Sequence, residues 1–291
     1  MKASAVEPAQ EHERDPSDGV SGRRPGSAIA RLRRAVAQVD LARLGRSARR
    51  ERGVLIALAV AAAGIWLFAE LADDVLEGDT RAFDRTLLLA LRDPGDPADA
   101  LGPAWIGEMM RDVTALGSSL VLAFLTLASA GYLWLQGRGR AALLLLAAIL
   151  GGFALSHGLK IGFDRPRPDL VAHGARVYTA SFPSGHAMQS AITYLTLGAL
   201  LARMQPKQRL KLYIIALASL LTVAVGFSRV YLGVHWPTDV LAGWAVGSAW
   251  ALLCWSIALW LQMRGKVETG AEPPAPGERA RPAASQADRL P

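Results

Sequence analysis

Three separated blocks of this sequence together supply several fixed cations and two histidines, one of which has an acidic residue four positions on. The candidate functional residues in these blocks are Lys160 and Arg167, then Ser184, Gly185 and His186, then Arg229, His235 and Asp239. Cations can hold the oxygens of a phosphoryl group, one histidine can transfer a proton, and a second histidine beside an acid can act as a nucleophile. These groups suffice to bind a phosphoryl group and attack its phosphorus without a metal ion.

The first block, Lys160-Ile-Gly-Phe-Asp-Arg-Pro-Arg167-Pro168, predicts an extended anion-binding segment. A residue that precedes proline is pushed out of the α region, so both arginines of this block should be extended. The planar fork of arginine binds phosphate oxygens in pairs, which makes Arg167 and Lys160 candidates for holding the phosphoryl group. Taken alone, these cations would equally fit ordinary charges at a membrane boundary.

The second block, Pro183-Ser184-Gly185-His186, opens an apolar stretch and has the composition of a helix start. Ser184 fits the N-cap position, and the free N–H groups of a helix N-terminus attract anions. Gly185 would let a phosphate approach the backbone closely. His186 would then lie beside that phosphate and could donate a proton to the leaving oxygen.

The third block joins two apolar stretches, the first ending at Ser228-Arg229 and the second opening at His235-Trp-Pro-Thr-Asp239. Asp239 can reach back to one imidazole nitrogen of His235, fix the tautomer and leave the other nitrogen free to attack phosphorus. Arg229 would add a further cation. Only His186 and His235 are well placed as imidazole ligands, and the surrounding cations disfavour a divalent metal, so we expect no metal ion and no cofactor.

The order and spacing of the blocks resemble the type 2 phosphatidic acid phosphatase family. Its pattern is Lys, six residues, Arg-Pro, then Pro-Ser-Gly-His, then Ser-Arg, five residues, His, three residues, Asp, and this sequence fills every position. The resemblance covers residues 54–263 and implies a six-helix membrane bundle and a two-step reaction. It implies that His235 becomes a phosphohistidine, that Asp239 orients it and that His186 protonates the leaving group. By the same resemblance, the transition state is held by Lys160, Arg167, Ser184, Gly185 and Arg229.

The elements that must position these residues are six apolar stretches, each close to the roughly 17–25 residues that a helix needs to cross a bilayer. They are Val54–Leu71, Val113–Leu135, Ala141–Leu159, His186–Ala202, Leu210–Phe227 and Val240–Met263. Hydrophobic residues make up 52% of the chain and are concentrated in these stretches, which indicates a membrane protein. The prediction is therefore an all-α, six-transmembrane helix bundle.

Lysines and arginines beside the stretches predict the orientation, because basic loops stay on the cytoplasmic side. With six spans, the basic flanks and both termini fall on that side, and the three blocks fall on the other. We therefore expect a multi-pass protein of the inner membrane with an outward-facing active site. The acidic connector Asp73–Asp112 also faces outward, and Phe83, Leu87, Leu88 and Leu91 within it have the spacing of a short interfacial helix. This helix would either guide a lipid chain or act as a lid without substrate contact.

Outside the membrane domain, 51–264, the sequence predicts two tails. Residues 1–50 form a basic, disordered cytoplasmic tail, in which Ala28–Ala42 could be an amphipathic helix, and residues 265–291 form a second disordered tail. The net charge of +7 lies mainly in the tails and in loops beside apolar stretches, which fits an anionic leaflet better than nucleic acid. One cysteine, Cys254, excludes an intrachain disulfide and indicates no redox compartment.

The expected partners are membrane lipids and a lipid phosphate substrate. The blocks recognise the phosphate and not the tail, so isoprenyl diphosphate, phosphatidylglycerophosphate, phosphatidate and lipid A phosphate all remain compatible. Two alternatives are a phosphotransferase with a lipid acceptor and a phosphate or anion transporter that uses the same cations. A transporter is disfavoured because the charges gather at one face and none lies mid-span. The sequence gives no oligomeric state.

Overall fold

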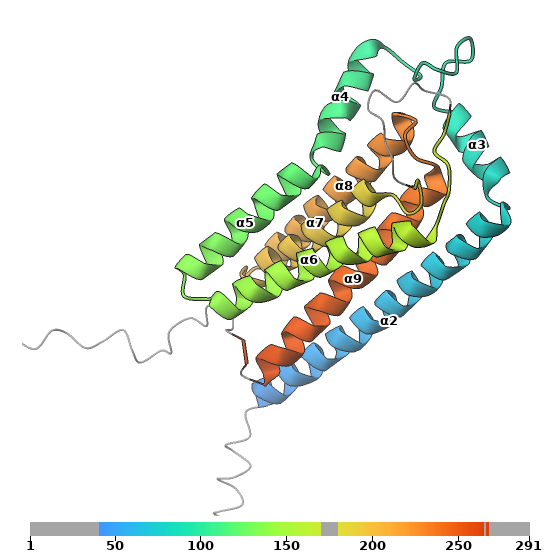
Figure 1. Cartoon of the computed structure of the whole chain (residues 1–291). Helices are drawn as coiled ribbons and strands as arrows, with labels where there is room; N and C mark the ends of the chain where they lie inside the picture. Colours follow the sequence, from blue (N-terminus) through green and yellow to red (C-terminus); the bar gives the residue numbers. More distant parts are fainter. Residues whose placement is uncertain (1–40, 170–179, 265, 268–291) are drawn as a thin grey trace, which may run out of the picture. The chain divides into compact units, whose positions relative to one another are not determined.

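The computed structural model describes residues 41–169, 180–264 and 266–267. The chain divides into two units, Met1–Glu51 and Arg52–Pro291, and all the candidate residues belong to the second. The described residues form helices, and the only β pairing among them is an isolated bridge between Arg92 and Ala100. The all-α prediction is confirmed. The helices, labelled in Figure 1, are α2 (Leu41–Glu77), α3 (Arg81–Leu89), α4 (Ala104–Ala115), α5 (Ser119–Leu135), α6 (Gly139–Gly162), α7 (Gly185–Arg203), α8 (Gln208–Tyr231) and α9 (Pro237–Met263).

Helix α7 packs mainly against α8 and α9, and it also contacts α5 and α6. Two glycines let α9 approach the backbone of α7. A Cβ atom on Gly243 would lie 2.8 Å from the Ser184 carbonyl oxygen, and one on Gly247 would lie 2.7 Å from the Met188 carbonyl oxygen. Such contacts between small residues let helix backbones pack closely in a membrane. They hold the start of α9 beside the start of α7.

Four described helices are long and apolar enough to cross a membrane, namely α6, α8, α9 and the Arg52–Glu77 part of α2. Helices α4 and α5 would supply a fifth crossing if the pair, bent by 43°, forms one span. Helix α7 is not among them, although it contains the predicted stretch His186–Ala202. Ser190 and Thr193 of α7 are fully buried, because other helices and not lipid surround them. The count of six spans stays a prediction.

The predicted span Val113–Leu135 is not one straight helix in the structure but falls on a bent pair of helices. Helix α4 ends at Ala115 and α5 begins after Ser118, whose hydroxyl accepts a hydrogen bond from the Val121 amide at 3.4 Å. Serine is a strong N-cap residue and favours a new helix start at this point. The preceding Gly117 packs against α8, where a Cβ atom would lie 2.4 Å from Val225 Cγ1. Local capping and close packing therefore break the apolar stretch.

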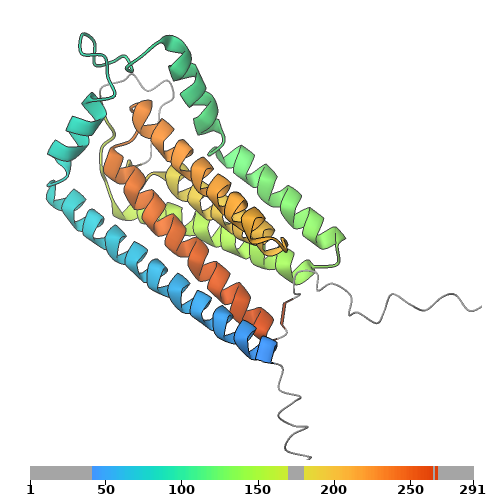
Figure 2. The ribbon, with the colours of Figure 1, turned by 180° about the vertical axis from the view of Figure 1, so that it is seen from behind.

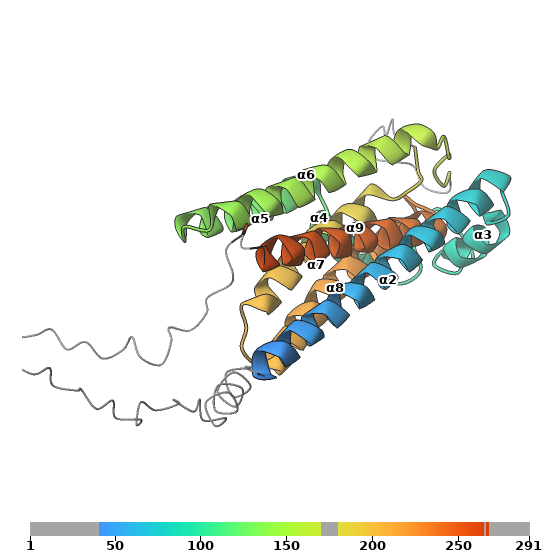
Figure 3. The same ribbon diagram turned by 90° about the horizontal axis from the view of Figure 1, so that it is seen from below.

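The boundary of the predicted N-terminal tail also needs correction. Helix α2 begins at Leu41, so residues 41–50, assigned above to a disordered tail, are helical. Leucine, alanine and arginine dominate this segment and have high helix propensity, and the helix continues into the apolar stretch. The rest of that tail, most of the amphipathic segment Ala28–Ala42, and nearly all of 265–291 lie outside the described residues. Within the second unit, α2 runs beside α9, and a Cβ atom on Gly64 would lie 3.0 Å from the Ala245 carbonyl oxygen (Figure 3).

The helix predicted within the acidic connector is confirmed as α3, and α4 was not predicted. Figures 1 and 2 show α3 and α4 at the end of the bundle where α7 and α9 begin. Leu88 of α3 is fully buried in a cluster with Val230 and Val240. Beyond α3, Arg92 donates a hydrogen bond to the Tyr231 carbonyl oxygen at 2.6 Å. The connector is thus fastened to the turn between α8 and α9.

Candidate active site

His235 lies in the turn before α9, where its two ring nitrogens face different partners. Nδ1 is 3.2 Å from Asp239 Oδ2, and Nε2 is 3.1 Å from Nη1 of Arg167. Because a guanidinium group only donates hydrogen bonds, Nε2 must be the acceptor and Nδ1 must carry the proton. The contact expected from the four-residue spacing is therefore present. Nε2 has its lone pair directed toward a cation, which is the state that a nucleophile requires.

Asp239 is fully buried and held by several donors. Its Oδ2 accepts a hydrogen bond from the Trp236 amide at 3.0 Å and another from the Ser181 hydroxyl, which also lies 3.3 Å from His235 Nδ1. The contact with the Trp236 amide caps the first turn of α9, where Pro237 fits because its missing N–H has no helical partner. One carboxylate thus caps α9 and orients His235.

Three cations converge near this pair from separate elements. Arg167 donates to the Val234 carbonyl oxygen at 2.9 Å, Lys160 to the Ala180 carbonyl oxygen at 3.3 Å, and Arg229 to Thr114 Oγ1 at 3.2 Å. Both arginines interact electrostatically with Lys160. The buried Nε of Arg229 has no hydrogen-bond partner within the described part of the chain. Mutual repulsion among the three cations would be relieved by an anion placed between them.

The start of α7 adds backbone donors to this cluster. Ser184 is the N-cap, with its hydroxyl accepting from the Ala187 amide at 3.5 Å, and its own amide donates to the Asp239 carbonyl oxygen at 2.9 Å. A Cβ atom on Gly185 would lie 3.4 Å from Cε of Lys160, so this cation lies beside the helix start. An uncharged N-cap next to a lysine makes a binding site for an anion.

His186 follows in the first turn of α7. The charges of Arg229, Lys160 and Arg167 all act on it. A Cβ atom on Gly117 would approach His186 Cδ2 to 3.4 Å, so the break between α4 and α5 lies against this histidine. The structure therefore brings all eight candidate residues together at one end of the bundle.

Burial determines the protonation state of the candidate nucleophile. Removal from water lowers the pKa of His235 to about 4, although the hydrogen bond and the charge of Asp239 act in the opposite direction. The imidazole is therefore neutral near pH 7 and its Nε2 lone pair is available. Burial also lowers the pKa of Arg167, an effect that Asp239 opposes, and a guanidinium group remains protonated in proteins.

Besides Ser181, sequence reasoning missed Arg165, which contacts Asp239 directly, and Asp84, which contacts it through Arg165. Arg165 donates to Asp239 Oδ1 from Nη1 and to Asp84 Oδ2 from Nη2, at 2.6 Å each. The sequence placed Arg165 in the first block without a role and left Asp84 between the apolar residues of α3. One signal was present, because Asp84 lies four residues before Leu88 and so shares its buried face.

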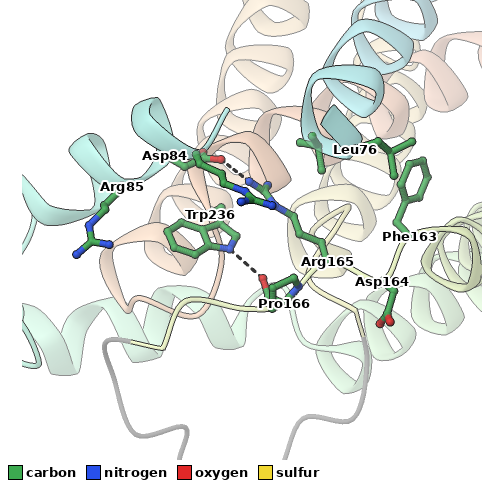
Figure 4. A pocket seen from close by; sticks show the side chains of 10 residues that line it. Leu76, Asp84, Arg85, Phe163, Asp164, Arg165, Pro166 and Trp236 are labelled. Atoms are coloured by element: carbon green, nitrogen blue, oxygen red, sulfur yellow. Dashed lines mark hydrogen bonds and ion pairs between the residues drawn. The ribbon is translucent and has the colours of Figure 1, made fainter. Parts of the chain in front are cut away.

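A cavity of about 470 Å³ adjoins these two residues (Figure 4). Its lining includes none of the eight candidate residues, so it is distinct from the candidate phosphate site. One wall is Trp236, whose indole N–H donates to the Pro166 carbonyl oxygen at 2.9 Å and whose ring lies 5.7 Å from the Arg165 guanidinium carbon. The lining residues are Val75, Leu76, Arg81, Asp84, Arg85, Phe163, Asp164, Arg165, Pro166 and Trp236.

Within the described ranges, no three histidine, cysteine, aspartate or glutamate side chains converge to hold a metal ion. The potential ligands near the cations are His186, His235 and Asp239, and the last two already bind each other. Independence from a metal or cofactor stays a prediction that activity measurements must test.

Comparison with known proteins identifies similar chains. Residues 141–263 match the family model described as the PAP2 superfamily. Over 150 residues the chain is 38% identical to phosphatidylglycerophosphatase B of Bacillus subtilis (strain 168). This alignment covers 49% of this chain and 70% of that protein. It is 48% identical over 68 residues to an undecaprenyl-diphosphatase of Sulfolobus acidocaldarius, covering 23% of this chain and 29% of the relative.

The fold is similar to a solved structure as well. The solved structure is that of a transmembrane PAP2-type phosphatidylglycerolphosphate phosphatase from Bacillus subtilis. The comparison gives a TM-score of 0.56 and 28% sequence identity. The match covers 69% of this chain and 95% of that one. The similarity therefore includes nearly the whole of that transmembrane protein.

Proposed function

Because the chain belongs to the PAP2 superfamily, we propose that it hydrolyses a lipid phosphate or diphosphate at the membrane through a phosphohistidine intermediate. The observation that carries the proposal is the pair of contacts of His235. Nδ1 faces the Asp239 carboxylate and Nε2 faces Arg167, so that the lone pair is directed toward the cation cluster. This is the arrangement of an oriented nucleophile beside an anion site.

In the first step, Nε2 of His235 attacks phosphorus and the bond between phosphorus and the lipid oxygen breaks. His186, which must enter the step as the imidazolium that a bound phosphate anion favours, donates a proton to that oxygen, and the lipid alcohol, or a lipid monophosphate from a diphosphate, leaves. Asp239 stabilises the positive charge that develops on the imidazole through its contact with Nδ1. The equatorial oxygens are held by Lys160, Arg167, Arg229, Ser184 and the Gly185 amide, which match the charge of the transition state.

In the second step, water attacks the phosphohistidine. His186, now neutral, accepts a proton from the water as the bond between nitrogen and phosphorus breaks. Inorganic phosphate leaves, and His235 recovers its Nε2 lone pair with Nδ1 still protonated. Both steps use the same cations, because charge develops on the same oxygens in each. No step requires a redox partner.

The substrate class follows from what the described site contacts. The cations and the start of α7 would bind a phosphoryl group, and no candidate residue is assigned to the lipid tail. The relatives carry the names of enzymes for phosphatidylglycerophosphate and undecaprenyl diphosphate. Both compounds are therefore candidate substrates, together with other isoprenyl diphosphates, phosphatidate and lipid A phosphate.

The proposed topology has six crossings with the active site facing outward and both termini in the cytoplasm. The crossings are α2, the bent pair α4–α5, α6, α7, α8 and α9. Basic residues between α5 and α6 and between α7 and α8 support this orientation, because such loops remain inside. Reporter fusions after Arg138, Lys207 and Asp96 test it: the first two should report the cytoplasm and the third the outside. Any other pattern contradicts the topology.

Phosphate release by the detergent-purified protein tests the activity. The substrates are isoprenyl diphosphate, phosphatidylglycerophosphate, phosphatidate and lipid A, each with a chelator, and His235→Ala is measured alongside. Release that survives chelation and disappears in the variant supports the proposal. Loss of activity with the chelator contradicts metal independence, and near-normal activity of His235→Ala contradicts the mechanism. Consumption of substrate without free phosphate would indicate transfer to a lipid acceptor.

A further inference from the structure

We propose that Arg165 and Asp84 form a positioning pair that holds Asp239 in the charged, oriented state that His235 requires. The inference deepens the proposed function and rests on it. Neither residue belongs to the sequence pattern formed by the three blocks. Asp84 also lies outside residues 141–263, the part of the chain that matches the family model. Figure 4 shows the guanidinium of Arg165 directed at Asp84.

Arg165 bridges two buried carboxylates. The side chains of Asp84 and Asp239 are 0% exposed and that of Arg165 is 11% exposed. Nη1 donates to Asp239 Oδ1 at 2.6 Å and to Thr238 Oγ1 at 2.8 Å, and Nη2 donates to Asp84 Oδ2 at 2.6 Å and to Thr80 Oγ1 at 3.1 Å. A lysine could not reproduce this bridge, because its single nitrogen lacks the planar fork of arginine.

Asp84 also holds the start of α9 directly. Its Oδ1 accepts from the Thr238 amide at 2.9 Å, and its Oδ2 accepts from the Thr238 hydroxyl at 2.7 Å. Carboxylates are favourable at a helix N-terminus, where backbone amides lack partners. Helix α3 thus contributes one N-terminal carboxylate to α9, and Asp239 contributes the other through the Trp236 amide.

The charges of this cluster explain why both residues are needed. Asp84, Arg165 and Asp239 together carry one net negative charge, which offsets the positive charge that His235 develops during attack. Without Arg165, two carboxylates would face each other in a buried site, and one would take up a proton. If Asp84 lost its charge, the charges of Arg165 and Asp239 would cancel, and no net negative charge would remain beside His235. The pair therefore keeps a negative charge available to His235.

The adjoining cavity of about 470 Å³ makes the role testable by chemical rescue, because it is lined by both Arg165 and Asp84. Truncation of Arg165 would leave a space that opens into this cavity. A guanidinium ion could enter and restore the two charged contacts. Rescue of turnover by a small cation is an outcome that general destabilisation of the fold would not produce.

The experiment compares Arg165→Ala with Arg85→Ala, a matched control whose exposed arginine lines the same cavity. We expect kcat of Arg165→Ala to fall by about 10²-fold with little change in KM, as for a misplaced catalytic group. Millimolar guanidinium should restore at least a tenth of the lost rate, and sodium at equal ionic strength should not. Arg85→Ala should retain kcat within about twofold, since no catalytic group loses a partner.

Normal kcat in Arg165→Ala overturns the inference, as does a folded, slow variant without guanidinium rescue. Should Arg165→Ala fail to fold, the nearly isosteric Asp84→Asn decides by the same measurement, because unchanged kcat there also overturns the inference. A wild type without phosphate release would contradict the proposed function instead. The positioning role then has its own readout, the ¹⁵N spectrum of the His235 imidazole. Loss of the single Nδ1–H tautomer in Asp84→Asn supports the role, and an unchanged spectrum contradicts it.

Discussion

The candidate active site contains two helix N-termini with opposite electrostatic character. Helix α7 begins at the uncharged cap Ser184 and lies beside Lys160. Helix α9 begins against two buried carboxylates, Asp84 and Asp239, which already accept hydrogen bonds from its first amides. The first terminus therefore remains available to an anion, and the second is satisfied by the protein itself. This difference agrees with the proposed roles, in which the start of α7 binds the phosphate and the start of α9 orients the nucleophile.

The largest expected effect comes from Asp239→Asn, which removes one of the two carboxylates at the start of α9. The amide retains the shape but cannot stabilise a positive imidazole, and it can reverse the tautomer of His235. We expect kcat to fall by about 10³- to 10⁴-fold, as for orienting carboxylates of this kind, with KM within a few fold of wild type. Single-turnover formation of phosphoenzyme measures the effect. A normal rate of phosphoenzyme formation would show that Asp239 does not orient the nucleophile.

The substitution Ser184→Asp would give the start of α7 a carboxylate cap, as the start of α9 already has. A carboxylate at this cap would occupy the anion site and repel the substrate phosphate. Activity should fall by about 10²- to 10³-fold, since a like charge within a few ångströms costs several kcal/mol at a partly buried site. The matched control is Ser184→Asn, which has almost the same size and also caps helices well. Equal losses in the two variants would indicate a steric effect and contradict the electrostatic distinction.

A smaller effect is expected where the two helix starts are held together. Gly243→Ala would place Cβ 2.8 Å from the Ser184 carbonyl oxygen and force α7 and α9 apart. The expected destabilisation is about 1–3 kcal/mol, typical of an overpacked contact, with a parallel loss of activity. Thermal unfolding in detergent measures it. Gly131→Ala is the control, because its Cβ would meet nothing within 4 Å, and equal unfolding temperatures for the two variants would disprove the tight contact.

The smallest effect concerns pH. The lowered pKa of His235 keeps the imidazole neutral from pH 7 down to about 4, so the acid limb of kcat/KM should lie below the ordinary value of 6.5. The same shift lowers stability in acid, because unfolded His235 binds a proton below pH 6.5 and folded His235 only near pH 4. Rates must be corrected for substrate phosphate, whose second pKa is about 6. If the corrected acid limb of kcat/KM has a pKa of 6.5 or above, His235 is not removed from water as described.

Local chemistry explains why so much of the site was predictable. The contact between His235 and Asp239 spans four residues at one helix start, and the Ser184 cap is set by its own helix. The three blocks also lie at those ends of the apolar stretches that meet at the same face. Helix starts and ends are determined by neighbouring residues, so the spacing of the sequence was sufficient to bring all eight candidates together.

Long-range pairing explains what the sequence did not reveal. Arg165 and Asp84 are 81 residues apart, and Thr238 and Asp84 are 154 apart. The spacing from Leu88 indicates that Asp84 is buried, but no local rule identifies Arg165 as its partner. The break between α4 and α5 was missed partly for a similar reason, since Gly117 acts through its contact with α8, although the Ser118 cap is local. Apolar composition predicts the presence of helices better than their interruptions.

The origin of Asp84 on α3 has a consequence for protein engineering. The segment that matches the family model, 141–263, contains the three blocks but not α3. A minimal catalytic core cut to that segment would lack one carboxylate of the α9 start, and Arg165 would lose half of its partners. Chimeras that exchange the catalytic helices between relatives should therefore transfer α3 with them. The modular unit of this enzyme is the matched segment together with α3.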